Sequence, residues 1–145
     1  MEKLTCSEFE PGRCFVGRLP YGKDLIKSIE DFCISSSIQM ASFSLIGAVS
    51  SFTIGAYDQK QQVYVTETET AAREIVNCSG NISMMDGKPF VHAHIVLGDE
   101  KGNTIGGHLF SETILFAGEI SLQEFIGKAL ERTYDKRTGL NLWQF

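Results

Sequence analysis

The sequence has few of the features that mark a membrane or secreted protein. No apolar run in its 145 residues approaches the roughly 20 residues that a membrane-spanning helix needs. The first residues, Met1-Glu2-Lys3-Leu4-Thr5, lack the apolar core of a secretory signal. The four cysteines form no CxxC pair and share no metal-like spacing; they are Cys6, Cys14, Cys33 and Cys78. We therefore expect reduced thiols in a cytoplasmic protein with no membrane partner, with Cys33 and Cys78 packed as small apolar groups.

Positive charge is also scarce. The chain has 13 Lys and Arg against 18 Asp and Glu, which gives a net charge of −5. Nucleic-acid binders usually carry a basic surface, because phosphate neutralisation drives their affinity. The one basic cluster, Arg132, Lys136 and Arg137, is more typical of a solvated face. The net charge therefore disfavours DNA as a partner.

Phosphate-binding motifs are missing as well. The sequence contains neither a P-loop nor a GxGxxG pattern, and Gly106-Gly107 is too short to hold a phosphate. Hydrophobic residues make up 43% and charged residues 21%, as in ordinary soluble globular proteins. With no repeat, linker or low-complexity tract, residues 1–145 are expected to form one domain with a substantial core.

The hydrophobic pattern predicts one principal helix among many strands. Leu25, Ile26, Ile29, Phe32 and Cys33 form one apolar stripe at helical spacing, with Lys27, Ser28, Glu30 and Asp31 on the other side. Strands are expected at 13–19 and 63–66, and 40–57 is read as two strands or one long bent strand. Residues 67–70 are expected to form a polar connection or a helical turn.

The later segments extend the strand pattern. Residues 74–85 predict a strand interrupted at Ser79-Gly80, and 86–89 a turn leading into a histidine-bearing strand. Residues 113–126 are ambiguous, because Ser121-Leu122-Gln123-Glu124 matches a helix capping box while the alternation favours a strand, which we prefer. The apolar tail 140–145 is expected to be docked. The fold class is therefore α+β, with a mainly antiparallel sheet and one principal helix.

All three histidines fall within one short region, and this region points most clearly to chemistry. His92 and His94 are two residues apart on an alternating strand, so they project from the same face, roughly 7 Å apart along the backbone. A three-residue loop, Glu100-Lys101-Gly102, would place Gly102 in the left-handed conformation. Counting back along both strands then puts His94 opposite His108, whereas a one-residue change in loop length would send His108 to the other face.

Three converging imidazoles predict a metal site at His92, His94 and His108. Neutral imidazole suits zinc, and also iron, nickel or copper. Three protein ligands with an open fourth position are typical of catalytic zinc, while structural sites usually have four ligands. We expect zinc or another divalent transition metal. The alternative is that two histidines satisfy hydrogen bonds at a sheet surface and the third is incidental.

Several short motifs surround the histidines. They are Leu45-Ile46-Gly47-Ala48-Val49, Cys78-Ser79-Gly80-Asn81-Ile82-Ser83, Asp86-Gly87-Lys88-Pro89-Phe90-Val91-His92-Ala93-His94, Leu97-Gly98-Asp99, Gly106-Gly107-His108-Leu109 and Thr138-Gly139-Leu140. Together, from about Arg13 to Phe145, the sequence resembles the PPC domain, the plants-and-prokaryotes conserved domain. The resemblance implies a compact α+β domain that assembles as a homotrimer.

The same resemblance carries a DNA-binding label, because plant members are fused to AT-hook segments. This chain has no Arg-Gly-Arg-Pro hook. Where plant members carry Gly-Arg-Phe-Glu-Ile-Leu, it has Ala71-Ala72-Arg73-Glu74-Ile75-Val76 and keeps only the Glu-Ile part. Both differences argue against DNA binding. The domain itself is then expected to act as an assembly module.

The histidine pattern is also similar to that of acetolactate decarboxylase, a zinc enzyme with a related fold. By that match His92, His94 and His108 would be the ligands, and the metal would polarise a keto acid. Such an enzyme needs a proton donor and a group that holds a carboxylate. Glu74, Glu112, Arg73 and Arg132 are available, each expected on the surface or at a trimer contact.

Two functions from different classes follow. The first is a trimeric PPC-domain protein with a three-histidine metal site and no assigned biochemical role. The alternative is a small-molecule zinc enzyme, a lyase acting on a keto acid, which would need a pocket of at least a few hundred Å3 beside the metal.

Overall fold

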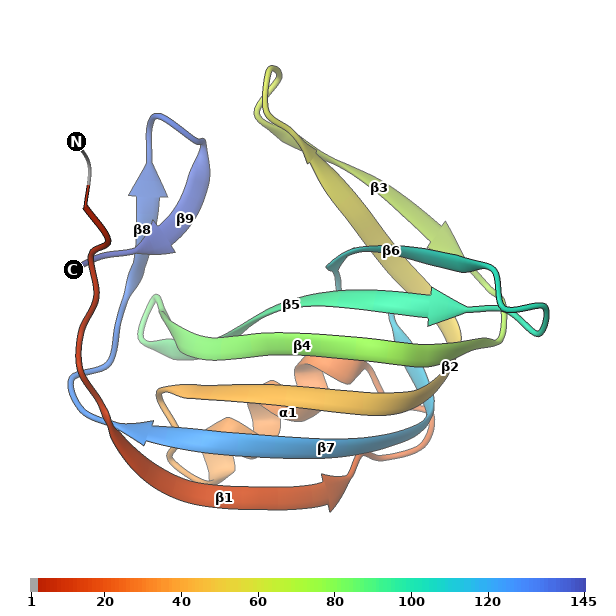
Figure 1. Ribbon diagram of the computed structural model, residues 1–145, viewed down its shortest axis with the longest axis horizontal. Coiled ribbons are helices and arrows are strands. Elements are labelled where there is room, and N and C mark those ends of the chain that lie inside the picture. Colours follow the sequence, from red (N-terminus) through yellow and green to blue (C-terminus); the bar gives the residue numbers. More distant parts are fainter. Residues whose placement is uncertain (1–2) are drawn as a thin grey trace.

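A computed structural model describes residues 3–145 (Figure 1). Met1 and Glu2, which open the segment assessed above for a secretory signal, lie outside the described residues. The elements in chain order are β1 (Glu10–Arg18), α1 (Leu25–Ser35), β2 (Ala41–Asp58), β3 (Val63–Glu69), β4 (Arg73–Met85), β5 (Lys88–Gly98), β6 (Thr104–Leu109), β7 (Ile114–Ile126), β8 (Arg132–Asp135) and β9 (Leu140–Trp143). No helix within residues 3–145 has the length and apolar character to cross a membrane.

The strands form one large antiparallel sheet in the order β1-β7-β2-β4-β5-β6, with β3 paired to β2. Strands β8 and β9 make a separate two-stranded sheet. One helix on a mainly antiparallel sheet confirms the predicted α+β class. The segment 40–57 is a single long strand, one of the two alternatives that the sequence allows.

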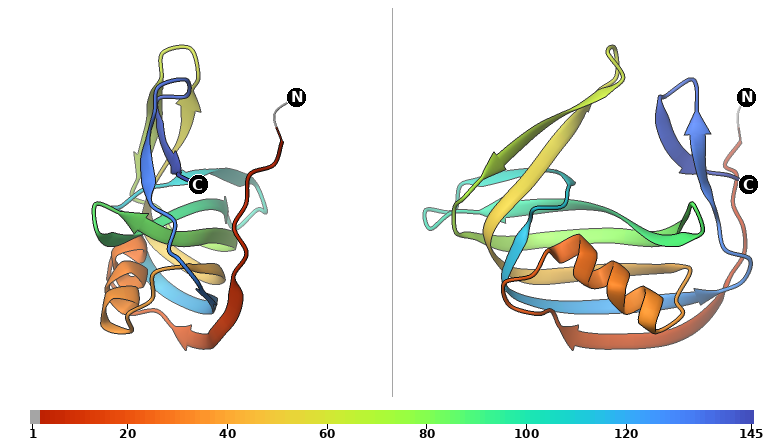
Figure 2. Two further views of the ribbon diagram at one scale, coloured as in Figure 1. Left: turned by 90° about the vertical axis from the view of Figure 1, so that its left-hand side faces the viewer. Right: turned by 180° about the vertical axis from the view of Figure 1, so that it is seen from behind.

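Helix α1 covers one face of the large sheet, as Figure 2 shows in the view from behind. The Asp24 side chain caps the helix by accepting a hydrogen bond from the Lys27 backbone N–H at 2.9 Å. The apolar stripe of the helix, including Leu25, Ile29 and Cys33, is buried against the sheet. Cys33 and Cys78 are both fully buried and the four cysteines are unpaired, as the sequence predicts.

Two predicted details of the strands are wrong. Residues 67–69 form no helical turn; they continue β3 and pair with 52–54 of β2, because β3 has a long neighbour that satisfies its backbone groups. Strand β4 is not broken at Ser79-Gly80, and its irregularity lies between Ile75 and Asn77, where the register shifts against β5. The ambiguous segment 113–126 is strand β7, as preferred, with no helix at Ser121.

Two hairpins rise from the sheet and meet at their tips. The Tyr57 hydroxyl of β2 donates a hydrogen bond to the Thr138 carbonyl oxygen at 2.6 Å, and the Gln62 side-chain amide donates to the Arg137 carbonyl at 3.0 Å. Gly139 has a φ of 72°, and a Cβ there would come within 2.6 Å of the Tyr57 hydroxyl. The β2–β3 and β8–β9 hairpins therefore form an arch. The C-terminal tail is docked, as predicted: the Trp143 indole N–H donates to the Ser83 hydroxyl of β4 at 3.0 Å, although Trp143 and Phe145 stay 38% and 53% exposed.

The other face of the large sheet is not covered by the helix, and it is the face turned toward the viewer in Figure 1. Core side chains of β5 alternate with side chains on this open face, so Val91, Ala93 and Ile95 are buried while His94 is exposed. The open face also carries exposed apolar side chains at Ile46, Val76 and Val96.

Candidate metal centre

The register of one hairpin brings the histidines together. Gly102 adopts a φ of 82°, its N–H donates to the Asp99 carbonyl oxygen at 3.0 Å, and the Asp99 N–H donates to the Asn103 carbonyl at 2.9 Å. This is the predicted three-residue loop, with Gly102 in the left-handed conformation that glycine adopts without steric cost. Strands β5 and β6 consequently pair His94 with His108, as the sequence predicts.

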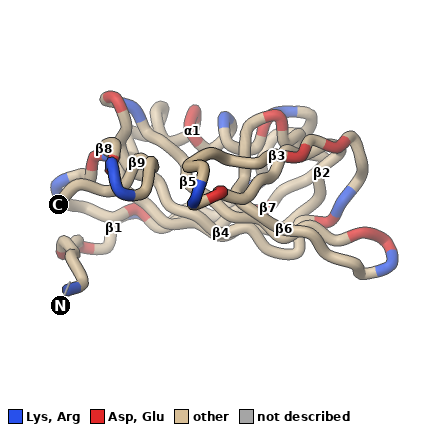
Figure 3. Tube along the Cα trace, turned by 90° about the horizontal axis from the view of Figure 1, so that it is seen from above, with Lys and Arg blue, Asp and Glu red and all other residues tan. Residues whose placement is uncertain are grey.

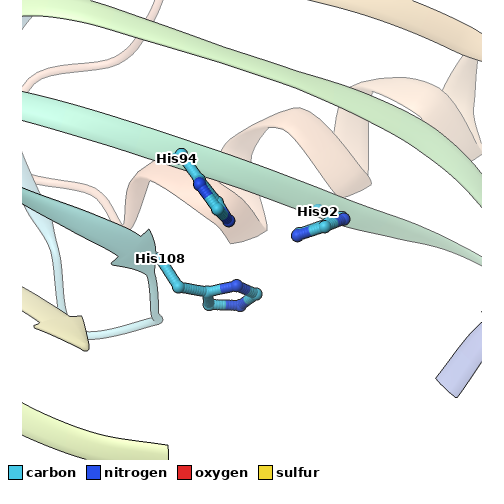
Figure 4. A group of neighbouring side chains, drawn as sticks. All are labelled: His92, His94 and His108. Atoms are coloured by element: carbon cyan, nitrogen blue, oxygen red, sulfur yellow. The ribbon is translucent and has the colours of Figure 1, made fainter. Parts of the chain in front are cut away.

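The three imidazole rings face a common space (Figure 4). Ring centroids are 5.0 Å apart for His92 and His108, 5.3 Å for His92 and His94, and 5.4 Å for His94 and His108. One nitrogen from each ring can be chosen so that all three lie within 4.8 Å of one another. Zinc–nitrogen bonds of about 2.0–2.1 Å place ligand nitrogens about 3.4 Å apart in a tetrahedron, so small ring rotations suffice. The donor set therefore fits a transition-metal ion.

The surroundings keep two of these imidazoles in the neutral form. Burial, with smaller contributions from His92, His94 and Arg132, lowers the pKa of His108 from 6.5 to about 4. Burial, followed by the positive charge of Arg132, also lowers the pKa of His92. Only a neutral imidazole has a free lone pair for a metal, so at neutral pH both rings are in the binding form.

Tyr64 of strand β3 orients the His108 ring. Its hydroxyl oxygen lies 3.4 Å from His108 Nδ1, and the two ring centroids are 4.7 Å apart. Phe110 also packs against the histidine, with its centroid 4.7 Å from that of His108 and 5.1 Å from that of Tyr64. When Nδ1 carries the proton and donates to Tyr64, the lone pair lies on Nε2, which is how outer partners usually orient a metal-binding histidine.

A pocket of about 570 Å3 opens beside the histidines, beneath the arch formed by the two hairpins. His92 and His108 line it, together with Tyr64 and the aliphatic side chains Ile26, Val63 and Leu142. Its ionisable lining otherwise consists of Arg132 and Glu30, with Tyr57 on the arch. A second, shallower depression on the open face is lined by His92 and His94, so the histidine cluster is accessible from two sides.

Arg132 lies in this pocket, contrary to the prediction that it belongs to a solvated face or a trimer contact. Its guanidinium packs between the rings of Phe90 and Trp143, with Cζ 5.5 Å and 5.3 Å from the two centroids. Burial lowers its pKa. Among residues 3–145 no carboxylate lies within ion-pair distance of it. Strand β8 brings this residue to the sheet, which its position in the sequence does not indicate.

The other predicted acid and carboxylate-binding residues lie outside the pocket. Arg73 pairs with Glu69 at 3.2 Å, Glu74 is exposed on β4, and Glu112 lies in the loop before β7 with a φ of 70°. In their place the pocket contains Tyr64 and Glu30, which the sequence analysis missed.

The sequence predicts Glu30 on the polar side of the helix, but its side chain turns toward β5. Its carboxylate accepts a hydrogen bond from the Val91 N–H at 3.2 Å, and burial raises its pKa. The one available signal for Glu30 is its proximity to the edge of the apolar stripe, next to Ile29, where a helical residue can face a neighbouring element. No signal in the sequence points to Tyr64, because its partner His108 is 44 residues away.

Comparison with known proteins identifies a matching family and similar solved structures. A family model for the Plants and Prokaryotes Conserved (PCC) domain, the PPC domain named above, matches residues 6–126. The metal-containing protein AF0104 from Archaeoglobus fulgidus is 46% identical, with a TM-score of 0.94 covering 98% of this chain and 100% of that one. A PPC protein from Pyrococcus horikoshii is 36% identical, with a TM-score of 0.92 covering 98% of both chains.

More distant relatives carry other descriptions. A candidate DNA-binding protein from Bacteroides thetaiotaomicron is 28% identical, with a TM-score of 0.83 covering 94% of this chain and 97% of that one. The bifunctional protein GlmU of Synechococcus sp. (strain JA-3-3Ab) is 32% identical over 130 residues, which cover 88% of this chain. Those residues amount to 20% of that curated protein, so this chain spans about a fifth of its length.

Proposed function

The chain belongs to the Plants and Prokaryotes Conserved (PCC) domain family, and on that premise we propose that it is a metal-binding member of the family. His92, His94 and His108 would hold one divalent transition-metal ion, with zinc as the best-matched ion. The observation that carries the proposal is the convergence of three ring nitrogens within 4.8 Å of one another. The description of the 46% identical Archaeoglobus fulgidus protein as metal-containing supports it.

The donor set favours zinc and leaves room for a further ligand. Imidazole nitrogens suit zinc, copper, iron and nickel, whereas magnesium and calcium prefer oxygen. Within residues 3–145 the cluster contains three His, Cys, Asp or Glu donors and no fourth. A tetrahedral ion would therefore keep one position for water or a small molecule, as catalytic zinc does. When bound, such an ion would act as a Lewis acid toward that fourth ligand.

Assembly as a homotrimer is part of the proposal. The open face of the sheet carries Ile46, Val76 and Val96, which are 56%, 53% and 38% exposed in the single chain. Exposed apolar groups on one face favour contact with another subunit. Light scattering coupled to gel filtration would test this part, and a monomer at micromolar concentration would refute it.

DNA binding has weaker support. Acidic and basic residues are interspersed along the molecule in Figure 3, without a continuous basic stripe. With a net charge of −5, assembly of several copies would multiply the negative charge. We infer that duplex DNA is not the main partner; tight binding at low salt that falls steeply as salt rises would overturn this inference.

A lyase acting on a keto acid is the second candidate function. The pocket of about 570 Å3 beside His92 and His108 supports it, because an enzyme for small molecules needs a cavity of a few hundred Å3 at its metal. Depletion of keto acids in a screen with metal-loaded protein would support this function. Equal turnover by a His94→Ala variant would assign any activity to a contaminant.

Elemental analysis of protein purified without a metal-affinity tag tests the primary proposal. Wild type should contain about one metal per chain, and His94→Ala should lose it because two imidazoles bind much more weakly than three. Ser79→Ala is the matched control: Ser79 lies opposite His94 on β4, offers no imidazole, and should leave the metal content unchanged. Metal-free wild type, after incubation with zinc and gel filtration, would refute the proposal.

A further inference from the structure

We infer that the pocket beneath the arch binds a small organic carboxylate, held at its charged end by Arg132 and along its body by the apolar walls. The carboxylate class follows from the chain's own residues. The contact with Arg132 does not depend on the proposed metal. Only a further contact rests on that proposal, in which an oxygen of the ligand would occupy the open coordination position of the metal ion.

Arg132 is fixed in place while part of its hydrogen-bonding capacity stays unused. Its Nε donates to the Ser83 hydroxyl at 2.9 Å, Nη1 to the Asn141 carbonyl at 3.2 Å, and Nη2 to the Asn81 side-chain oxygen at 2.8 Å. A guanidinium has five N–H groups, so two remain available. All three partners are neutral, and a partly buried cation without an anion retains an uncompensated desolvation cost.

The position of the guanidinium links it to the histidines. Asn81, which accepts from Nη2, lies directly opposite His92 in the β4–β5 register. Directly opposed residues of antiparallel strands have Cβ atoms about 5 Å apart. Arg132 and His92 both line the pocket. One small molecule can therefore reach the guanidinium and the space between the imidazoles at the same time.

The charge balance of the pocket calls for an anion. Its lining contains one arginine and one carboxylate, Glu30, whose oxygen already accepts from the Val91 N–H. Adding a divalent ion at neutral imidazoles would make the pocket strongly positive. A monoanionic carboxylate matches a single planar guanidinium through two parallel hydrogen bonds. A phosphate dianion has three acceptor oxygens, and among the described lining residues Arg132 is the one Lys or Arg side chain that could pair with them.

The walls indicate that the ligand carries an apolar body. Ile26, Val63, Leu140 and Leu142 line the pocket, and the Phe90 ring lies beside the guanidinium. A volume of about 570 Å3 is within the range of pockets that enclose small organic molecules. Acetate would leave most of this space to water, so a branched-chain acid is the better match.

Calorimetric titration with 4-methyl-2-oxopentanoate tests the inference, using metal-loaded wild type and variants. Arg132→Gln should bind about ten- to a hundredfold more weakly, because it removes charge-assisted hydrogen bonds, while its metal content stays unchanged. Asn141→Asp adds a competing carboxylate at the pocket and leaves Arg132 in place, so it should weaken binding about three- to tenfold. Asn77→Asp makes the same charge change outside the pocket and should bind like wild type.

Two further measurements separate this inference from the metal proposal. Cobalt-substituted wild type should change its visible spectrum on adding the acid, and the neutral methyl ester should not reproduce the change. Metal-free His94→Ala should bind the acid more weakly than wild type, yet still depend on Arg132. A metal-free wild type would refute the metal proposal alone. Equal binding to wild type and folded Arg132→Gln, or tighter binding of inorganic phosphate than of the acid, would refute the carboxylate pocket.

Discussion

Acidification of the metal-free protein should destabilise it well above the pH at which carboxylates titrate. The burial of His108 lowers its pKa to about 4, whereas an unfolded histidine titrates near 6.5. Between these values the unfolded chain binds a proton that the folded chain does not. The free energy of unfolding therefore falls as the pH falls from 6.5 to about 4 and stays level for this group below that range.

The size of the effect follows from the shift. Each pH unit well below 6.5 costs at most about 1.4 kcal/mol for one such group, and solvent screening of the half-buried ring reduces this, so His108 alone removes roughly 1 kcal/mol between pH 6.5 and 5. His92, whose pKa is also lowered, adds to the loss. Glu30 has a raised pKa and opposes it at the acidic end, because the folded state then takes up the proton more readily. Glu124 has a lowered pKa, so its contribution is lost only near and below its ordinary value of 4.5.

Urea unfolding of chelator-treated protein at fixed protein concentration measures this loss at half-unit steps from pH 7 to 5. His108→Gln is the matched control, since it keeps a polar side chain at the position and removes the titrating ring. Between pH 7 and 5 the slope for the variant should be lower by about 0.5–1 kcal/mol per pH unit. Parallel pH profiles for wild type and the variant would refute the assignment of the shift to this buried ring.

Three other changes test the fold around the site. Gly80→Ala should destabilise the protein by about 2 kcal/mol in urea unfolding, because the added Cβ would overlap the backbone of β5 and the neighbouring side chains; wild-type stability would disprove this close approach. Glu124→Gln should cost about 1–3 kcal/mol in the same assay, because it breaks the 2.6 Å ion pair of a buried carboxylate with Arg13; an unchanged midpoint would argue against that pair. Cys33 and Cys78, whose thiol pKa values burial raises to about 12, should resist a thiol reagent at pH 8, leaving two reactive cysteines in the native chain and four in urea; rapid reaction of all four in the native state would contradict their burial.

The histidine hairpin could be predicted because everything that fixes it is local. The loop 100–102 contains a glycine where a left-handed residue is needed, and strand alternation then determines which side chains share a face. The apolar stripe of α1 is local in the same sense. These local patterns were enough to predict the fold class and the clustering of the three histidines.

The rest of the pocket could not be predicted in this way. Arg132 reaches Asn81 across 51 residues of sequence, and Tyr64 reaches His108 across 44. Both contacts depend on how the two hairpins lean over the sheet, which the Tyr57–Thr138 hydrogen bond between their tips helps to fix. The sequence predicts only the first half of β3, residues 63–66, for a related reason, since Glu67 and its neighbours have a polar sequence and become a strand only beside β2.

The side chains of strand β5 alternate between the core, which stabilises the fold, and the candidate metal site. Val91, Ala93 and Ile95 face the core, while His92 and His94 face the site, so removing an imidazole leaves no cavity in the core. The unliganded site, in contrast, has neutral imidazoles and a partly buried Arg132 without an anion, both of which carry a desolvation cost. Binding of a metal and a carboxylate to the folded chain would recover that cost. Each would therefore raise the unfolding temperature by an amount that grows with the logarithm of its concentration divided by its Kd, and we expect His94→Ala to fold without the metal.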